Sequence, residues 1–235
     1  MKEKKRQRYL EILNSNILFR HLGEQNLGAL LNNFQEEKWT KNTVAVNRNH
    51  TLYRFYIIFS GRIKVYKIDP FTGREFTLFL LTKNDFFDIL CLLDGYEHHV
   101  YHQPLDNAII LSVSMSKMRE WLKEHPEMNQ ALLPYLMKRL RIVEEYASNI
   151  TLIDISTRLA LLILKNINQK SQKLELINDL SHEEIANLIG STRAVVNRHL
   201  QEFKEVGILN IGRKKMEIQN LQLLLDKVEN RISKE

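Results

Sequence analysis

The sequence is poor in cysteine and in long hydrophobic runs. Cys91 is the one cysteine among 235 residues, which excludes an intramolecular disulfide and any all-cysteine cluster built by one chain. Because Cys91 lies in an apolar setting without a flanking cation, we expect a small buried side chain rather than a reactive thiol. No run approaches the roughly 18 apolar residues of a membrane helix, so we expect no membrane partner.

The amino-terminal residues lack the apolar core of a secretory signal. The first eight, MKEKKRQR, are basic and lead into an amphipathic pattern, so we expect a cytoplasmic location. Internal repeats and low-complexity segments are also missing. With 44% hydrophobic and 26% charged residues the composition is that of a globular chain, and its length suggests two domains.

Positive charge is in modest excess. The formal net charge of +6 permits nucleic-acid binding but does not establish it. Residues 151–235 carry 13 lysines and arginines against 11 acidic residues, so the C-terminal part is not the more basic one. An argument for DNA binding therefore depends on where particular cations lie.

Residues 180–211 have the pattern of two short helices joined by a glycine. Ser181 and Glu184 form a Ser-x-x-Glu capping box just before an apolar run. Gly190 suits the left-handed conformation of a tight helix end, and Ser191 and Thr192 can each cap the next helix. The segment predicts a helix-turn-helix.

The second of these helices has an inward and an outward face. Val196, Leu200 and Phe203 are spaced to pack inward. In a helix-turn-helix the N-terminal residues of the second helix enter the major groove, where arginine pairs with guanine and asparagine with adenine. The predicted DNA-contacting residues of this segment are Ser191, Thr192, Arg193, Ala194, Asn197 and Arg198. The alternative is an ordinary helical hairpin with solvated arginines.

The residues that follow weigh against that alternative. The segment ILNIGRKKMEIQNL alternates apolar and polar residues about a Gly-Arg-Lys-Lys turn, which predicts a two-stranded wing. Arg213, Lys214 and Lys215 at its tip would face phosphates, which position a protein without reading sequence.

The first half of the chain has a different pattern. Residues 4–38 show helical patterns broken near residues 21–23. From about Trp39 the chain becomes rich in β-branched and aromatic residues, beginning with TVAV at residues 43–46, so residues 40–115 predict an antiparallel roll or small barrel. A helix is expected from Ser116.

The longest helical pattern begins beyond Pro126 and reaches about Ile150. Its apolar residues are spaced 3, 4, 3, 4, 3, a heptad seam that favours a symmetric dimer over packing on the chain's own roll. Pro134 should kink this helix or mark its start. The seam consists of Leu133, Leu136, Leu140, Val143, Ala147 and Ile150.

These patterns predict an α+β chain with three segments. Residues 1–125 are the N-terminal helices and β-roll, and residues 126–151 are a long dimerisation helix. Residues 152–235 are a winged helix-turn-helix domain, whose first helix, TRLALLILKNI, is apolar on several faces and should be buried.

This order of elements resembles the family of the cyclic-AMP receptor protein and the fumarate–nitrate reductase regulator (CRP/FNR). The resemblance covers nearly the whole chain. It implies a cyclic-nucleotide-binding-like roll and a bacterial homodimeric transcription regulator, not an enzyme, that binds an inverted repeat in double-stranded DNA. RNA polymerase is a further implied partner if the protein activates transcription. The motifs that carry it are FYIIFSGRIKVYKIDPFTGREFTLFLL, NDFFDILCLL, DISTRLALLIL and LSHEEIANLIGSTRAVVNRHLQEFKEVGIL.

Two departures from the family pattern bear on function. Arg193 and Arg198 match the family's DNA-contacting arginines, but Ala194 stands where a glutamate usually accepts from cytosine, so we expect a half-site other than TGTGA. Cyclic-AMP-binding members carry Gly-Glu and Arg-Ser pairs, for which this chain has Asp88-Ile89 and approximately His98-His99. Without the arginine an anionic phosphate has no bidentate partner, which argues against cyclic AMP. The iron–sulfur cysteines are also missing.

The resemblance implies that an effector bound in the roll reorients the two reading helices through the long helix, so we expect an effector-controlled regulator, whose effector stays unidentified at this point. Candidate pocket residues are Phe87, Ile89, Leu90, His98 and His99. One alternative is a haem-based gas sensor that uses a histidine of YEHHVYHQP. Another is a regulator without an effector, whose pocket large apolar side chains fill. A metal-dependent, cupin-like enzyme is disfavoured, because His98, His99 and His102 lie too close on one strand to supply a ligand set, and no zinc spacing or catalytic residue is identified.

Overall fold

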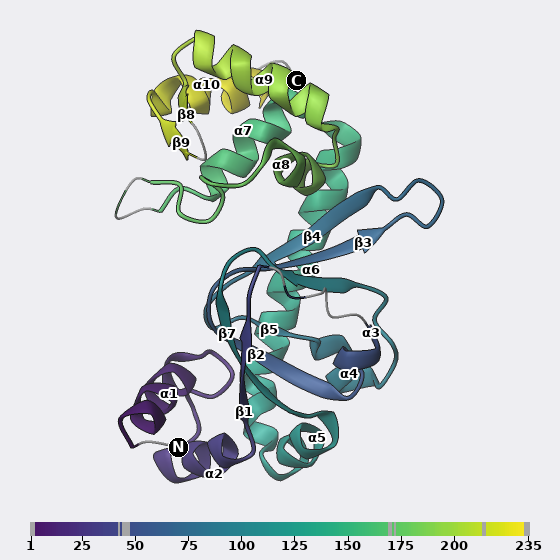
Figure 1. Ribbon diagram of the computed structural model, residues 1–235, viewed down its shortest axis with the longest axis vertical. Coiled ribbons are helices and arrows are strands. Elements are labelled where there is room, and N and C mark those ends of the chain that lie inside the picture. Colours follow the sequence, from purple (N-terminus) through teal and green to yellow (C-terminus); the bar gives the residue numbers. More distant parts are fainter. Residues whose placement is uncertain are drawn as a thin grey trace. The chain divides into compact units, whose positions relative to one another are not determined.

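The chain divides into two compact units. The computed structural model describes residues 3–41, 43, 48–168, 171, 173–212 and 215–232 (Figure 1). One unit comprises Met1–Arg74 with Leu78–Ile142, and the other comprises Glu75–Thr77 with Val143–Glu235. Among the described residues, none of the helices combines the length and the apolar character needed to span a bilayer.

The first unit begins with helices α1 (Glu3–Ser15) and α2 (Glu24–Asn32) and strand β1 (Gln35–Trp39). The helical pattern expected through residue 38 was therefore wrong at its end. Strand β1 pairs antiparallel with a later strand, from Gln35 opposite Ser112 to Trp39 opposite Ala108, and this pairing outweighs the local preference. Most of the expected TVAV strand lies outside the described residues.

The predicted β-roll is confirmed and consists of two antiparallel sheets (Figure 1). The four-stranded sheet has the order β1-β7-β2-β5, and the three-stranded sheet has the order β4-β3-β6. The elements after β1 are α3 (Arg48–Thr51), β2 (Arg54–Ser60), β3 (Ile63–Ile68), β4 (Glu75–Leu81), β5 (Phe86–Phe87), α4 (Ile89–Asp94), β6 (Tyr101–Pro104) and β7 (Ala108–Ser114).

Strand β2 separates two hydrophobic clusters. Because successive side chains of a strand point to opposite faces, Phe55 and Ile57 belong to one cluster and Tyr56 and Ile58 to the other. The first cluster packs the N-terminal helices against the four-stranded sheet. The second contains residues from both sheets and fills the interior of the roll.

Helix α5 (Met115–Glu124), a short 3-10 turn η1 (Pro126–Met128) and the long helix α6 (Asn129–Leu152) follow the roll. Ser114 caps α5, since its hydroxyl accepts from the Lys117 backbone N–H at 3.4 Å. Pro134 lies inside α6 rather than at its start.

The second unit contains α7 (Ile155–Lys165), α8 (His182–Ile189), α9 (Arg193–Glu205), β8 (Leu209–Gly212), β9 (Lys215–Ile218) and α10 (Leu221–Ile232). Asp154 caps α7 by accepting from the Thr157 backbone N–H at 3.0 Å. Leu159, Ala160 and Ile163 of α7 are fully buried, as the apolar pattern predicts. Helix α10, which the sequence analysis did not identify, packs against α7.

Candidate nucleic-acid interface

The predicted capping box and glycine turn shape the entry to α9. The Ser181 hydroxyl accepts from the Glu184 backbone N–H at 3.2 Å, and the Ser181 backbone N–H donates to the Glu184 carboxylate at 2.7 Å. Gly190 ends α8 in the left-handed region, with φ 65° and ψ 43°. An added Cβ there would lie 3.4 Å from Cδ1 of Ile150, so glycine suits both the turn and its surroundings.

The two candidate caps of α9 have different surroundings. The Thr192 hydroxyl accepts from the Val195 backbone N–H at 3.4 Å and therefore caps the helix. Ser191 is only 6% exposed, so its side chain points into the protein. Of these two predicted DNA contacts, only Thr192 has its side chain at the surface.

The inward face of α9 is buried as the sequence predicts. Val196, Leu200 and Phe203 are almost inaccessible to solvent, and α9 packs against α7 and α8. The Lys227 ammonium of α10 lies 5.7 Å from the centroid of the Phe203 ring. This packing fixes which side of α9 is left for a ligand.

The outward face of α9 carries the predicted base-reading group. Arg193, Ala194, Asn197 and Arg198 are all exposed, and the Arg198 side chain keeps 66% of its accessible surface. A guanidinium has five N–H donors in a fixed planar fork, and an asparagine amide both donates and accepts. This face can therefore pair with base edges without rearrangement of the core.

The wing follows α9 as predicted, with β8 and β9 pairing from Leu209 opposite Ile218 to Gly212 opposite Lys215. Arg213 and Lys214 lie outside the described residues. Lys215 is exposed, and its ammonium lies 2.8 Å from the Glu217 carboxylate.

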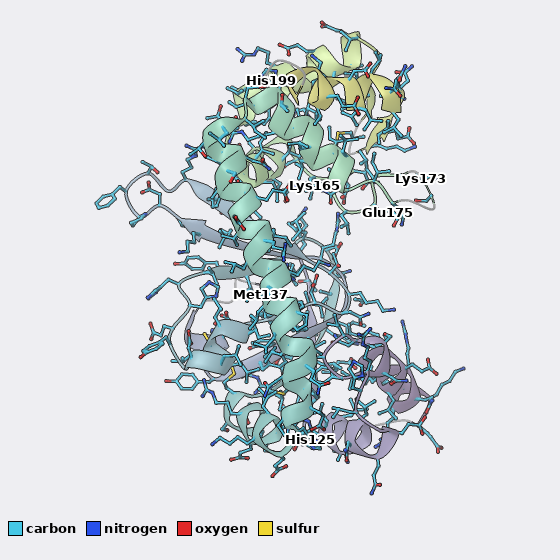
Figure 2. All side chains as sticks on the ribbon, turned by 180° about the vertical axis from the view of Figure 1, so that it is seen from behind. His125, Met137, Lys165, Lys173, Glu175 and His199 are labelled. Carbon is cyan, nitrogen blue, oxygen red and sulfur yellow. The ribbon has the colours of Figure 1, made fainter. Side chains whose placement is uncertain are left out.

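The predicted dimerisation residues of α6 do not all share the exposed face. Leu133, Leu140, Val143, Ala147 and Ile150 are exposed. Leu136 instead packs against the core of its own unit, which is the alternative that the seam left open. Met137 is 50% exposed and lies on the outer side of α6 (Figure 2), although the seam did not include it.

The apolar candidate effector residues have different surroundings. Phe87 is buried inside the roll, where its ring stacks on Tyr56 at 4.8 Å and on His102 at 4.4 Å between centroids. Ile89 belongs to the other cluster, and Leu90 is exposed. Phe87, Ile89 and Leu90 thus point to three different surroundings.

Asp88 and His98 form a hydrogen-bonded pair that the sequence analysis missed. Asp88 is 3% exposed, and one carboxylate oxygen lies 2.6 Å from Nδ1 of His98. Burial raises the pKa of Asp88, but the hydrogen bond from His98 and the nearby charges of His102 and His98 outweigh it, so the pKa lies below its usual value. The available signal was a single acidic residue between two apolar pairs, Phe-Phe and Ile-Leu.

The three histidines considered for haem or a metal have separate roles. His98 pairs with Asp88, His99 is exposed, and His102 is buried against Phe87. The described residues include no group of three or more histidine, cysteine, aspartate or glutamate side chains arranged to hold a metal ion. Among the described residues there is thus no three-ligand set of the kind that the cupin alternative requires.

The helix pair, its exposed face and the wing define a winged helix-turn-helix DNA-binding protein. Residues 157–227 match the model of the Crp-like helix-turn-helix domain. The chain is 28% identical over 188 residues to the CRP-like cAMP-activated global transcriptional regulator of Mycobacterium tuberculosis, covering 75% of this chain and 84% of the relative. It is 26% identical over 212 residues to the global nitrogen regulator of Synechocystis, covering 86% and 90%. Over most of its length the chain is thus similar to transcription regulators of the CRP/FNR type.

Solved structures share the fold. A CRP/FNR-family transcriptional regulator from Thermus thermophilus aligns with a TM-score of 0.66 and 19% identity, covering 83% of this chain and 98% of that one. The c-di-GMP-responsive global regulator CLP of Xanthomonas campestris aligns with a TM-score of 0.72 and 16% identity, covering 84% and 100%. The relatives named here are regulators rather than enzymes, in agreement with the sequence-based prediction.

Proposed function

We propose that this CRP/FNR-type regulator is a homodimer that reads an inverted repeat in double-stranded bacterial DNA. The observation that supports it most directly is the exposure of Arg193, Asn197 and Arg198 together on the outward face of α9. Two such helices in a two-fold dimer would enter major grooves about 34 Å apart, one helical turn of DNA. Because the proposed target is bacterial DNA, we also propose a cytoplasmic location.

The outward face of α9 divides into base-reading and backbone-contacting roles. In this proposal Arg193 pairs with guanine and Asn197 with adenine, while Arg198 contacts a base or a phosphate. Because Ala194 cannot accept a hydrogen bond, the half-site should differ from TGTGA at the pair that a glutamate would read. The proposed phosphate contacts of the wing are Arg213, Lys214 and Lys215.

We assign dimerisation to α6, within a scheme of roll (residues 1–125), dimerisation helix (residues 126–151) and DNA-binding domain (residues 152–235). Leu133, Met137 and Leu140 form an exposed apolar row at helical spacing. A row of this kind loses contact with water when an equivalent helix packs against it, which favours a two-fold pair.

The residues of the roll favour a regulator that cyclic AMP does not control. At the position of the family's Gly-Glu pair, the Asp88 carboxylate is buried and already paired with His98, and Ile89 is in a packed core. Trp39, Tyr56 and Phe87 lie in the interior of the roll, and their rings contact one another. Large aromatic side chains in this interior favour a regulator that binds DNA without a bound effector. If it activates transcription, RNA polymerase is a further partner.

Selection from a random DNA pool tests the proposal. The purified chain should enrich an inverted repeat whose half-site centres lie about one helical turn, or 10 to 10.5 base pairs, apart. Enrichment of direct repeats, of single half-sites or of no common sequence would count against the paired reading helices. The selection is repeated after small molecules have been removed from the purified protein, and again after a small-molecule extract of cells has been added. A difference between the two shows whether an effector is needed.

A further inference from the structure

Glu202 lies on α9 one turn after Arg198 and contacts two side chains of the same helix. One carboxylate oxygen lies 2.8 Å from Nδ1 of His199, and the other lies 3.9 Å from Nε of Arg198. His199 is the more buried partner, with 15% of its side chain accessible, and Figure 2 shows it on α9. His199 therefore anchors the carboxylate, whose other oxygen lies within ion-pair distance of the arginine.

The Arg198 side chain is 66% exposed, so a contact that orients it bears on how it pairs with DNA. An arginine side chain carries about 2 kcal/mol of rotamer entropy, part of which is lost when it pairs with a base. On a helix, residues four positions apart face each other. Four positions before Arg198 stands Ala194, which cannot hydrogen bond, and four positions after it stands Glu202. The acidic partner thus lies on the C-terminal side of the arginine.

The carboxylate is ionised at neutral pH. The hydrogen bond from His199, helped by the charges of His199, Arg198 and Lys227, lowers the pKa of Glu202 below its usual value. A negative charge in the last turns of a helix opposes the helix dipole, and a carboxylate near DNA repels phosphates. The helix dipole and the repulsion from phosphates thus both disfavour a glutamate at this position, whereas its contacts with Arg198 and His199 favour it.

We propose that Glu202 is a positioning residue that orients the Arg198 guanidinium and so sharpens its preference for one base pair. This inference rests on the proposed function, and of the two contacts proposed there for Arg198 it takes the contact with a base. His199 contributes by fixing the carboxylate. The chemistry is that of a charged side chain held in its productive rotamer by a second residue that does not touch the ligand.

The experiment compares Glu202→Gln with the wild type on the selected operator and on its single base-pair variants. Glu205→Gln is the matched control, because Glu205 is also exposed on α9 and its substitution removes the same charge. We expect Glu202→Gln to reduce the ratio of affinities for the preferred and the other base pairs at the position read by Arg198. The reduction should be about twofold to fivefold, which corresponds to the energy of an exposed ion pair. Glu205→Gln should leave the preference unchanged, and in an Arg198→Ala background Glu202→Gln should have no further effect on it.

Three results would overturn the inference. Glu202→Gln could strengthen binding to every sequence equally, with a steeper salt dependence, which is the result for simple phosphate repulsion. It could shift the preference only as much as Glu205→Gln does. A wild-type chain that selects no common sequence would refute the proposed function and this inference with it. If the wild type does select a sequence and Glu202→Gln has the same base-pair preference as the wild type, the inference alone is refuted. Thermal unfolding of both variants shows that each folds.

Discussion

Leu140 lies in the exposed row of α6, and shortening it to alanine should weaken the homodimer. Its side chain is 58% exposed in the single chain. Complete burial of a leucine side chain is worth about 1.5–3 kcal/mol, so covering the exposed part contributes about 1 kcal/mol per protomer. In a two-fold interface Leu140 contributes once from each protomer, about 2 kcal/mol in total. The loss of this contribution corresponds to roughly a thirtyfold increase in the dimer dissociation constant.

Sedimentation equilibrium over a range of protein concentrations measures this constant. Leu223→Ala is the control, because Leu223 is an exposed leucine on α10 and lies outside α6. DNA affinity should fall with dimerisation in the Leu140→Ala variant and recover at high protein concentration. An unchanged dissociation constant, or an equal loss in Leu223→Ala, would refute the assignment of the interface to this row of α6.

Three further predictions concern the reading helix, the roll and the turn. Arg193→Ala should reduce the discrimination at one base pair by about 1–3 kcal/mol of binding free energy. Lys215→Ala should weaken binding to all sequences alike and reduce the slope of log affinity against log salt concentration by about 1. Fluorescence anisotropy measures both affinities, and equal behaviour of the two variants contradicts their separate roles. Asp88→Asn removes the charge paired with His98 and should lower the free energy of unfolding by about 1–3 kcal/mol at pH 7. Because the folded pKa of Asp88 is lowered, this difference should persist above about pH 4 and shrink as the pH falls further; a pH-independent difference contradicts it. Gly190 has a φ of 65°, so Gly190→Ala should lower the free energy of unfolding, measured by thermal unfolding, by about 1–2 kcal/mol. An unchanged free energy would show that the turn tolerates a side chain.

Local chemistry is what made the reading unit predictable from sequence. A capping box and a glycine at a helix end act over four or five residues, so Ser181, Glu184 and Gly190 could be placed without knowledge of the fold. The inward spacing of Val196, Leu200 and Phe203 is likewise a property of one helix.

Features that depend on distant contacts were harder to predict. Ser191 and Thr192 can both cap a helix, and only the packing of the unit decides which one is buried. A 3, 4 spacing on α6 does not tell which side of the helix its own roll covers, so Leu136 was included and Met137 was left out. The pairing of Asp88 with His98 depends on a loop that brings together residues ten positions apart.

The paired reading of DNA is tested most directly by the spacing of the operator. The affinity of the purified protein is measured for the selected inverted repeat, for the same DNA with one half-site scrambled, and for DNA with about five base pairs, half a helical turn, inserted between the half-sites. We expect both altered operators to lose most of the sequence-specific affinity, because each leaves one α9 helix without its half-site. Equal affinity for all three would contradict a dimer that presents two reading helices to one face of the DNA.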